Sequence, residues 1–101
     1  MMTPDDAIGA FLYGLTLLVI GEDGLQFDKC DPADMQAVGG AAILTYRIAA
    51  RGETPSDFAL SRLCVLTGAL LVAPRGPDGA RIVREWLDAR NEFTALQLAA
   101  G

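Results

Sequence analysis

The chain has 101 residues, of which 51% are apolar and 21% charged, and its formal net charge is −5. This length predicts a single domain, residues 1–101, and this composition excludes an intrinsically disordered, collagen-like or low-complexity chain. The chain has one lysine and its seven arginines are dispersed, so it lacks the clustered positive charge that binds phosphate backbones, and we expect no nucleic-acid partner.

Three segments begin with the same helix-start pattern. Each has a capping Thr or Asp, then proline, then an aspartate in the first turn: Thr3-Pro4-x-Asp6, Asp31-Pro32-x-Asp34 and Thr54-Pro55-x-Asp57. The capping oxygen accepts a backbone N–H at the start of a helix, proline suits the first helical position, and the helix dipole favours the carboxylate. With glycine or proline as stop signals, this pattern predicts helices over residues 4–20, 32–50 and 55–72.

An acidic segment connects the first two predicted helices. Residues 1–34 hold seven acids against Lys29 alone, and five of these acids form a predicted acidic rim: Glu22, Asp23, Asp28, Asp31 and Asp34. Such acids can simply serve helix starts and loops, or they can attract a basic partner. Their order does not match a calcium-binding loop, and we predict no metal site. Leu25-Gln26-Phe27 is apolar enough to form a short extended piece.

The last predicted helix, 79–98, differs from the others because it has one apolar side. Ile82, Trp86, Ala89 and Phe93 recur at spacings of four and three, as on a helix that lies on the surface of a core. The four predicted helices indicate an all-α fold, a compact four-helix bundle made of two antiparallel helical hairpins.

The first three helices carry more apolar surface than one side of a helix needs. Residues 7–20, 35–46 and 63–74 contain no charge, and a helix that is apolar all round must be covered on every side. A membrane span is disfavoured, because the uncharged segment 7–20 has only 14 residues and lies between acids. We therefore expect a homo-oligomer, most simply a homodimer through helices 1 and 3 or 2 and 3, or a different protein partner.

Side chains that support catalysis are scarce. The chain has no histidine, which is the usual proton carrier near neutral pH and the commonest metal ligand. Ser56 and Ser61 have no evident base, Cys30 lies among acids that disfavour a thiolate, and Cys64 lies in an apolar helix. No phosphate-binding glycine loop or dinucleotide motif is present. We predict a non-enzymatic protein with no catalytic residue and no cofactor.

Two features bear on the location and source of the protein. Residues 1–7 lack the basic start of a secretory signal, and two cysteines without such a signal are typical of reduced thiols in the cytoplasm. Abundant Ala, Gly and Arg with a single Lys indicate a GC-rich bacterial or phage genome.

These observations predict a small cytoplasmic protein–protein interaction module, such as an adaptor, an assembly or secretion chaperone, or an inhibitor. It would act through an apolar helix face and the acidic rim. The candidate interface residues are Phe11, Tyr13, Leu17, Phe27, Leu66, Leu70, Trp86 and Phe93. The alternative is a domain that binds or senses a small apolar ligand in a pocket between the helices, near Thr16, Thr45 and Thr67.

Overall fold

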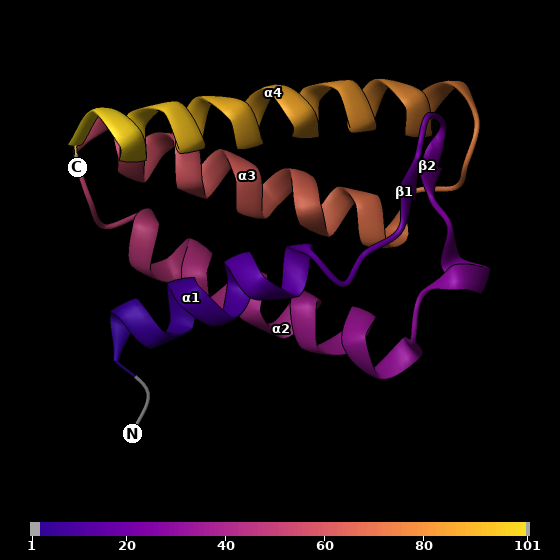
Figure 1. The fold of residues 1–101 in the computed structure, drawn as a ribbon, viewed down its shortest axis with the longest axis horizontal. Coiled ribbons are helices and arrows are strands. Elements are labelled where there is room, and N and C mark those ends of the chain that lie inside the picture. The colour runs from indigo at the N-terminus through magenta and orange to yellow at the C-terminus, as the bar shows by residue number, and fades with distance from the viewer. Residues whose placement is uncertain (1–2, 101) are drawn as a thin grey trace.

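The computed structural model describes residues 3–100, and within them four α-helices run alternately in opposite directions (Figure 1). The helices are α1 (Pro4–Leu15), α2 (Pro32–Ala49), α3 (Pro55–Val72) and α4 (Pro77–Ala100). Two short strands, β1 (Ile20–Gly21) and β2 (Gly24–Leu25), and one 3₁₀ turn, η1 (Phe27–Lys29), lie between α1 and α2. The all-α four-helix bundle expected from the sequence is confirmed.

The helix starts have the geometry that their sequence pattern predicts. The Thr54 hydroxyl accepts the Asp57 backbone N–H at 3.1 Å, and the Asp57 carboxylate accepts the Thr54 N–H at 3.2 Å. Thr3 and Asp6 form the same reciprocal pair at the start of α1. At the start of α2 the Asp31 carboxylate accepts a backbone N–H. Each cap satisfies donors that have no partner within the helix.

Helix α1 ends five residues earlier than predicted, and this part of the prediction is wrong. The Thr16 hydroxyl donates to the Tyr13 carbonyl at 2.6 Å, and the chain then becomes extended. Ile20 pairs with Leu25 in a small antiparallel hairpin, and Gly24 in its turn has a φ of +140°. Residues 19 and 20 are β-branched and precede a glycine-containing turn, which favours a strand over a helix.

The other helix bounds lie close to their predictions. Helix α3 has the predicted bounds, and α2 ends one residue early. Helix α4 starts two residues earlier than expected, because Pro77 takes the first helical position. Its end, Ala100, is two residues later than predicted.

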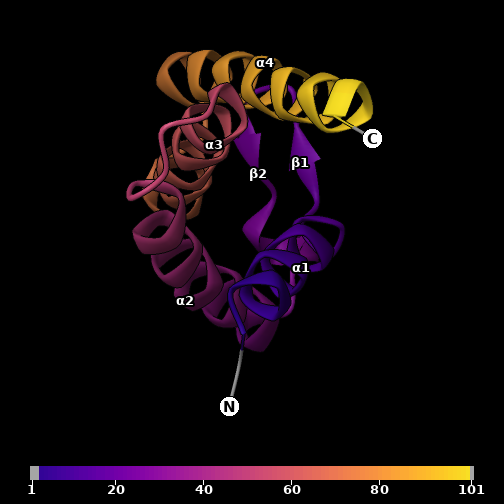
Figure 2. The ribbon, with the colours of Figure 1, turned by 90° about the vertical axis from the view of Figure 1, so that its left-hand side faces the viewer.

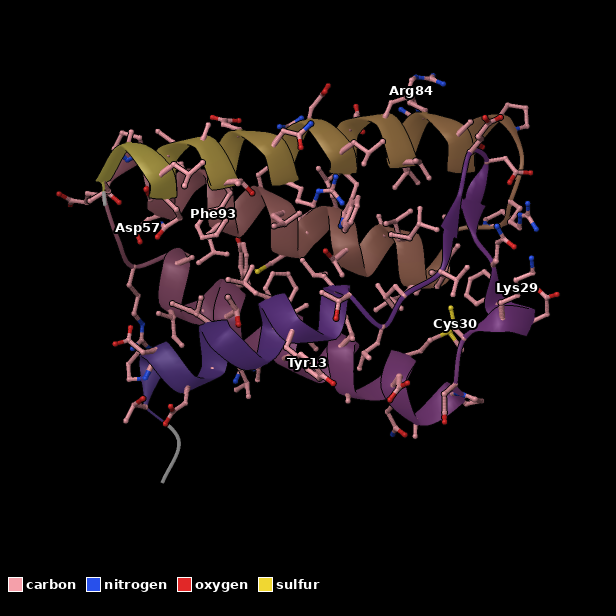
Figure 3. The ribbon with its side chains drawn as sticks, in the orientation of Figure 1. Tyr13, Lys29, Cys30, Asp57, Arg84 and Phe93 are labelled. Atoms are coloured by element: carbon pink, nitrogen blue, oxygen red, sulfur yellow. The ribbon has the colours of Figure 1, made fainter. Side chains whose placement is uncertain are left out.

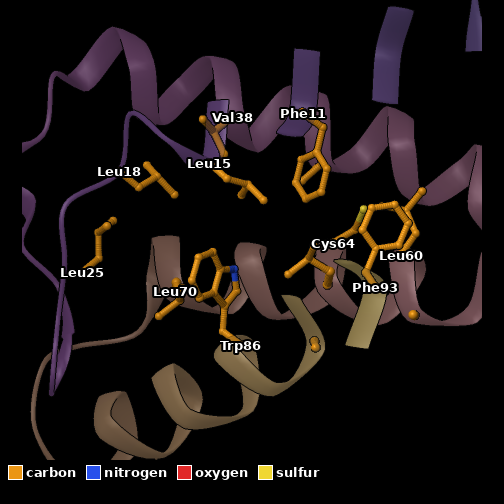
Figure 4. Close-up of a cluster of buried hydrophobic side chains, with 14 of the residues drawn as sticks. Phe11, Leu15, Leu18, Leu25, Val38, Leu60, Cys64, Leu70, Trp86 and Phe93 are labelled. Atoms are coloured by element: carbon orange, nitrogen blue, oxygen red, sulfur yellow. The ribbon is translucent and has the colours of Figure 1, made fainter. Parts of the chain in front are cut away.

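The helices surround one core in sequence order. Each packs on the next, while α1 and α4 contact each other little and the hairpin lies between them, with β2 against α3 and α4 (Figure 2). Side chains from all four helices and the hairpin meet in the middle, among them Phe11, Leu25, Leu70 and Trp86 (Figure 4). The bundle is thus tightly packed around most of its circumference and joined by the hairpin on the remaining side.

Two buried threonines hold helices together inside this core. The Thr45 hydroxyl donates to the Ala7 carbonyl of α1 at 3.3 Å. The Thr67 hydroxyl donates to the Leu63 carbonyl at 2.7 Å and accepts the Trp86 indole N–H at 2.9 Å. Within residues 3–100 no buried side-chain nitrogen or oxygen lacks a hydrogen-bond partner.

Candidate interaction surface

A groove of about 580 Å³ lies between α2 and α3 on the outside of the bundle. Its lining residues are Gly39, Ala42, Ile43, Tyr46 and Arg47 from α2 and Cys64, Val65, Gly68, Leu71 and Val72 from α3. We call these ten residues the α2–α3 face. Arg47 is the one charged residue among them, so the face is almost wholly apolar.

Large apolar side chains on this face are exposed to water. The exposed fractions are 58% for Ile43, 43% for Tyr46, 58% for Val65 and 82% for Val72. Together they present on the order of 450 Å² of surface, within the range of about 300–600 Å² expected for the largest apolar patch on a soluble monomer, which is often functional. This patch is the strongest indication of a working surface in residues 3–100.

The same face follows a regular spacing in the sequence. On α2 the spacing of three and four residues runs through Gln36, Gly39, Ile43, Tyr46 and Ala50. On α3 it runs through Phe58, Ser61, Val65, Gly68 and Val72. This alternation is the pattern of a helix seam that packs against another helix. It is present in the sequence, but with Gln36, Ser61 and two glycines in it the spacing alone does not identify the face.

Glycines leave part of this face open. A Cβ atom added at Gly68 would have no atom within 4 Å, and one added at Gly39 would contact only Leu71, at 3.5 Å. The space beside Gly39 is thus filled by Leu71 of the same chain, whereas the helix backbone at Gly68 is open. A partner side chain can approach closely there.

None of the eight candidate interface residues is among the ten residues of this face, although Leu66 lines the adjoining opening beside Tyr46 and Val65. Four of them, Phe11, Leu70, Trp86 and Phe93, are buried in the core. In Figure 3, Phe93 points from α4 toward the interior, whereas Arg84 points outward. Leu17 and Leu66 are half-buried, and Tyr13 and Phe27 are exposed at 66% and 38%.

The four buried residues are therefore core residues and not part of an exposed interface. For Phe11 and Leu70 the reason is that helices with apolar residues on several sides give no internal sign of which side faces inward. Trp86 and Phe93 lie on the one apolar side of α4, and this side packs on the core of the same chain. An interface role for exposed Tyr13 and Phe27 stays a prediction.

The acidic rim occupies the end of the molecule that carries the hairpin, η1 and the start of α2, opposite the two termini (Figure 1). Asp23 binds Arg75 at 2.6 Å and Asp31 caps α2, so two of the five acids have structural partners. Glu22 and Asp28 are exposed. A docking role for this rim stays a prediction.

A second opening of about 530 Å³ lies between α1, the hairpin and α4, where the helices pack least. Leu15, Thr16, Trp86 and Arg90 are among its lining residues, and the Arg90 guanidinium lies 5.1 Å from the centroid of the Trp86 ring. The predicted pocket near three threonines is not assembled here, because Thr45 and Thr67 are buried and hydrogen-bonded.

Both cysteine side chains are buried in the fold. Cys30 Sγ accepts the Val19 backbone N–H at 3.3 Å, near the hairpin (Figure 3). Burial raises the pKa of the Cys64 thiol to about 12, which keeps it protonated and unreactive at neutral pH. Among residues 3–100 no three His, Cys, Asp or Glu side chains lie together as a metal site.

Helix α3 is the one helix in residues 3–100 that is long and apolar enough, by length and composition, to cross a membrane. The central helix of a water-soluble bundle meets the same criterion. In this fold α3 packs between α2 and α4.

No family model, curated protein or solved structure matches this chain.

Proposed function

We propose that this protein is a small cytoplasmic protein–protein interaction module, an adaptor, assembly or secretion chaperone, or inhibitor, whose working surface is the α2–α3 face. One observation carries the proposal: four large apolar side chains are exposed around a groove lined by a single charged residue. The largest apolar patch on a soluble protein is often the surface that binds a partner or ligand.

The patch can supply a large part of the free energy that binding needs. At about 25 cal/mol per Å², covering roughly 450 Å² contributes on the order of 10 kcal/mol before costs. Association costs about 4–15 kcal/mol, so the partner must add its own well-packed apolar anchors. The centre of the groove, between Ile43, Tyr46 and Val65, is where the largest individual contributions are expected, because anchors are strongest where water is fully excluded.

Photocrosslinking in the source cell tests this function. A crosslinking amino acid at Ile43 samples the groove, and the same group at Arg84, on the outer side of α4, is the matched control. We expect polypeptide adducts at position 43 that are identified by mass spectrometry, are absent at position 84, and disappear when Val65→Glu is added. Equal labelling at both positions, or no polypeptide adduct at position 43, contradicts the proposal.

A second candidate function is binding of a small apolar ligand. The observation that favours it is the opening beside Trp86, whose indole and the neighbouring leucines form an apolar wall under Arg90. A ligand selective for the folded state raises the melting temperature with its concentration. A lipophilic compound panel, read by thermal shift and by the fluorescence of the single tryptophan, tests this alternative.

A further inference from the structure

We propose that the occupant of the α2–α3 face is a second copy of this chain, so that the protein is a two-fold symmetric homodimer joined through α2 and α3. This inference rests on the proposed function for the location of the surface. It adds the identity of the partner.

The area available matches what a small dimer needs. A standard interface buries about 800 Å² per partner, and the four exposed side chains of the groove supply roughly half of it. Phe58, 63% exposed, continues the α3 seam one heptad before Val65, and Ala50 continues the α2 seam. Two copies that meet along both seams therefore bury an area in the range of stable interfaces.

The shape of the face suits a copy of itself. A two-fold interface uses the same patch on both subunits, so the patch must contain both the protruding and the receiving parts. Ile43 and Val65 protrude, while Gly68 leaves open backbone on the same face. A protruding side chain of one copy can fill the space at Gly68 of the other, as in seams of alternating large and small residues.

Charge permits this pairing in spite of a net charge of −5 on each copy. The α2–α3 face contains no acid, and the acidic rim lies at the hairpin end of the molecule. Arg47 lines the groove, and Glu85 borders the adjoining surface beside Tyr46 and Val65. A symmetric interface thus has both signs of charge at its border and an uncharged centre, the arrangement typical of protein interfaces.

The chemistry of the face disfavours an anionic membrane surface as the occupant. Surface-bound amphipathic helices carry several Lys and Arg around their apolar side, whereas here Arg47 in the lining and Arg62 beside Tyr46 and Val65 are accompanied by the acid Glu85. Binding to anionic vesicles would therefore contradict the dimer.

Sedimentation velocity on purified full-length protein, from 0.5 to 100 µM, tests the proposal. The chain mass is 10.7 kDa, and we expect a concentration-dependent species of twice that mass. Val65→Glu and, separately, Ile43→Glu should weaken the dimer at least about tenfold, since they place a charge in an apolar contact. Leu98→Glu, at a 77% exposed site on α4, adds the same charge elsewhere and should leave the dimer unchanged.

Circular dichroism and tryptophan fluorescence verify that each variant is folded, which is expected because all three sites are exposed. Isotope-filtered NOEs in a mixture of labelled and unlabelled protein should connect methyl groups of Ile43, Val65 and Val72 between copies. A monomer at 100 µM, NOEs confined to another face, or flotation with anionic phospholipid vesicles overturns the dimer. If adducts at position 43 then identify a different protein, the proposed function stands without this inference.

Discussion

The indole Nε1 of Trp86 donates a 2.9 Å hydrogen bond to Thr67 Oγ1, which itself donates to the Leu63 carbonyl at 2.7 Å. This chain joins α4 to α3 in the centre of the core, where Trp86 is 3% exposed and Thr67 fully buried. A single hydroxyl thus serves as acceptor and donor at once. It explains how a polar residue fits in the middle of an otherwise apolar helix.

Replacing Thr67 by valine should destabilise the fold by about 1–3 kcal/mol, the cost of leaving a buried donor without a partner. Valine has nearly the same shape, so the change removes the acceptor of the Trp86 N–H and leaves the volume. Urea unfolding followed by tryptophan fluorescence, at one fixed protein concentration, measures the loss. Thr67→Ser keeps the hydroxyl and should retain the hydrogen bond. Equal stability of the valine variant and the parent would contradict this account.

Gly79→Ala should destabilise the protein, because a Cβ at this first-turn position of α4 would overlap the backbone carbonyl oxygen of Asp23 in the hairpin. Neither backbone can yield easily, since the Asp23 carbonyl also accepts the Gly76 N–H at 3.0 Å and its carboxylate binds Arg75. We expect a loss above 1 kcal/mol, in the range of overpacked sites.

Gly9→Ala is the matched control for this prediction. Gly9 lies inside α1, and a Cβ there would meet no atom within 4 Å. Alanine should therefore stabilise the helix by up to about 1 kcal/mol. Thermal unfolding of both variants should show shifts in opposite directions, and a shared direction would mean that the hairpin does not pack on α4 as described.

The local sequence was enough to predict the starts of α1, α2 and α3, because a capping oxygen, a proline and a carboxylate act within four residues of each other. The end of α1 was not predictable in this way. Residues 17–20 are apolar enough for a helix, and the β-branched residues 19 and 20 only weakly favour a strand; Leu18 before the hairpin and Leu25 within it are both buried in the core. That preference depends on packing against distant residues.

The location of the candidate surface was predictable only in part. The sequence indicated that α3 is apolar on more than one side, and Val65 and Val72 are indeed exposed. It could not indicate that Phe11 of α1 and Leu70 of α3 face inward, since on these helices an apolar residue looks the same at a core and at an interface. The spacing through Gly39, Ile43 and Gly68 acquires meaning once the neighbouring helices are known to cover the opposite sides.

The capping box of α3 provides a test of how much the helix starts contribute. Thr54→Ala removes the acceptor of the Asp57 N–H and should cost about 1 kcal/mol. Thr94 is a useful control. It is exposed on α4, and its hydroxyl donates to the Arg90 carbonyl in the same helix without capping a helix end. Thr94→Ala should therefore change the free energy of unfolding much less. Similar losses for both variants would show that the cap adds little.

Alkaline pH should destabilise the fold through Cys64. Its pKa is about 12 in the folded protein, whereas an unfolded thiol ionises near 8.5. Between these two pKa values the folded state holds a proton that the unfolded state has lost, so the free energy of unfolding falls as the pH rises. Below about pH 8 both states hold the proton, and the free energy of unfolding is retained in full. The expected loss between pH 8 and 10 is about 1–2 kcal/mol for this group. In Cys64→Ala the overall stability is lower, but this part of the pH dependence should vanish. Urea unfolding of both proteins at pH 8, 9 and 10 measures the difference, and parallel profiles would place the thiol in contact with water.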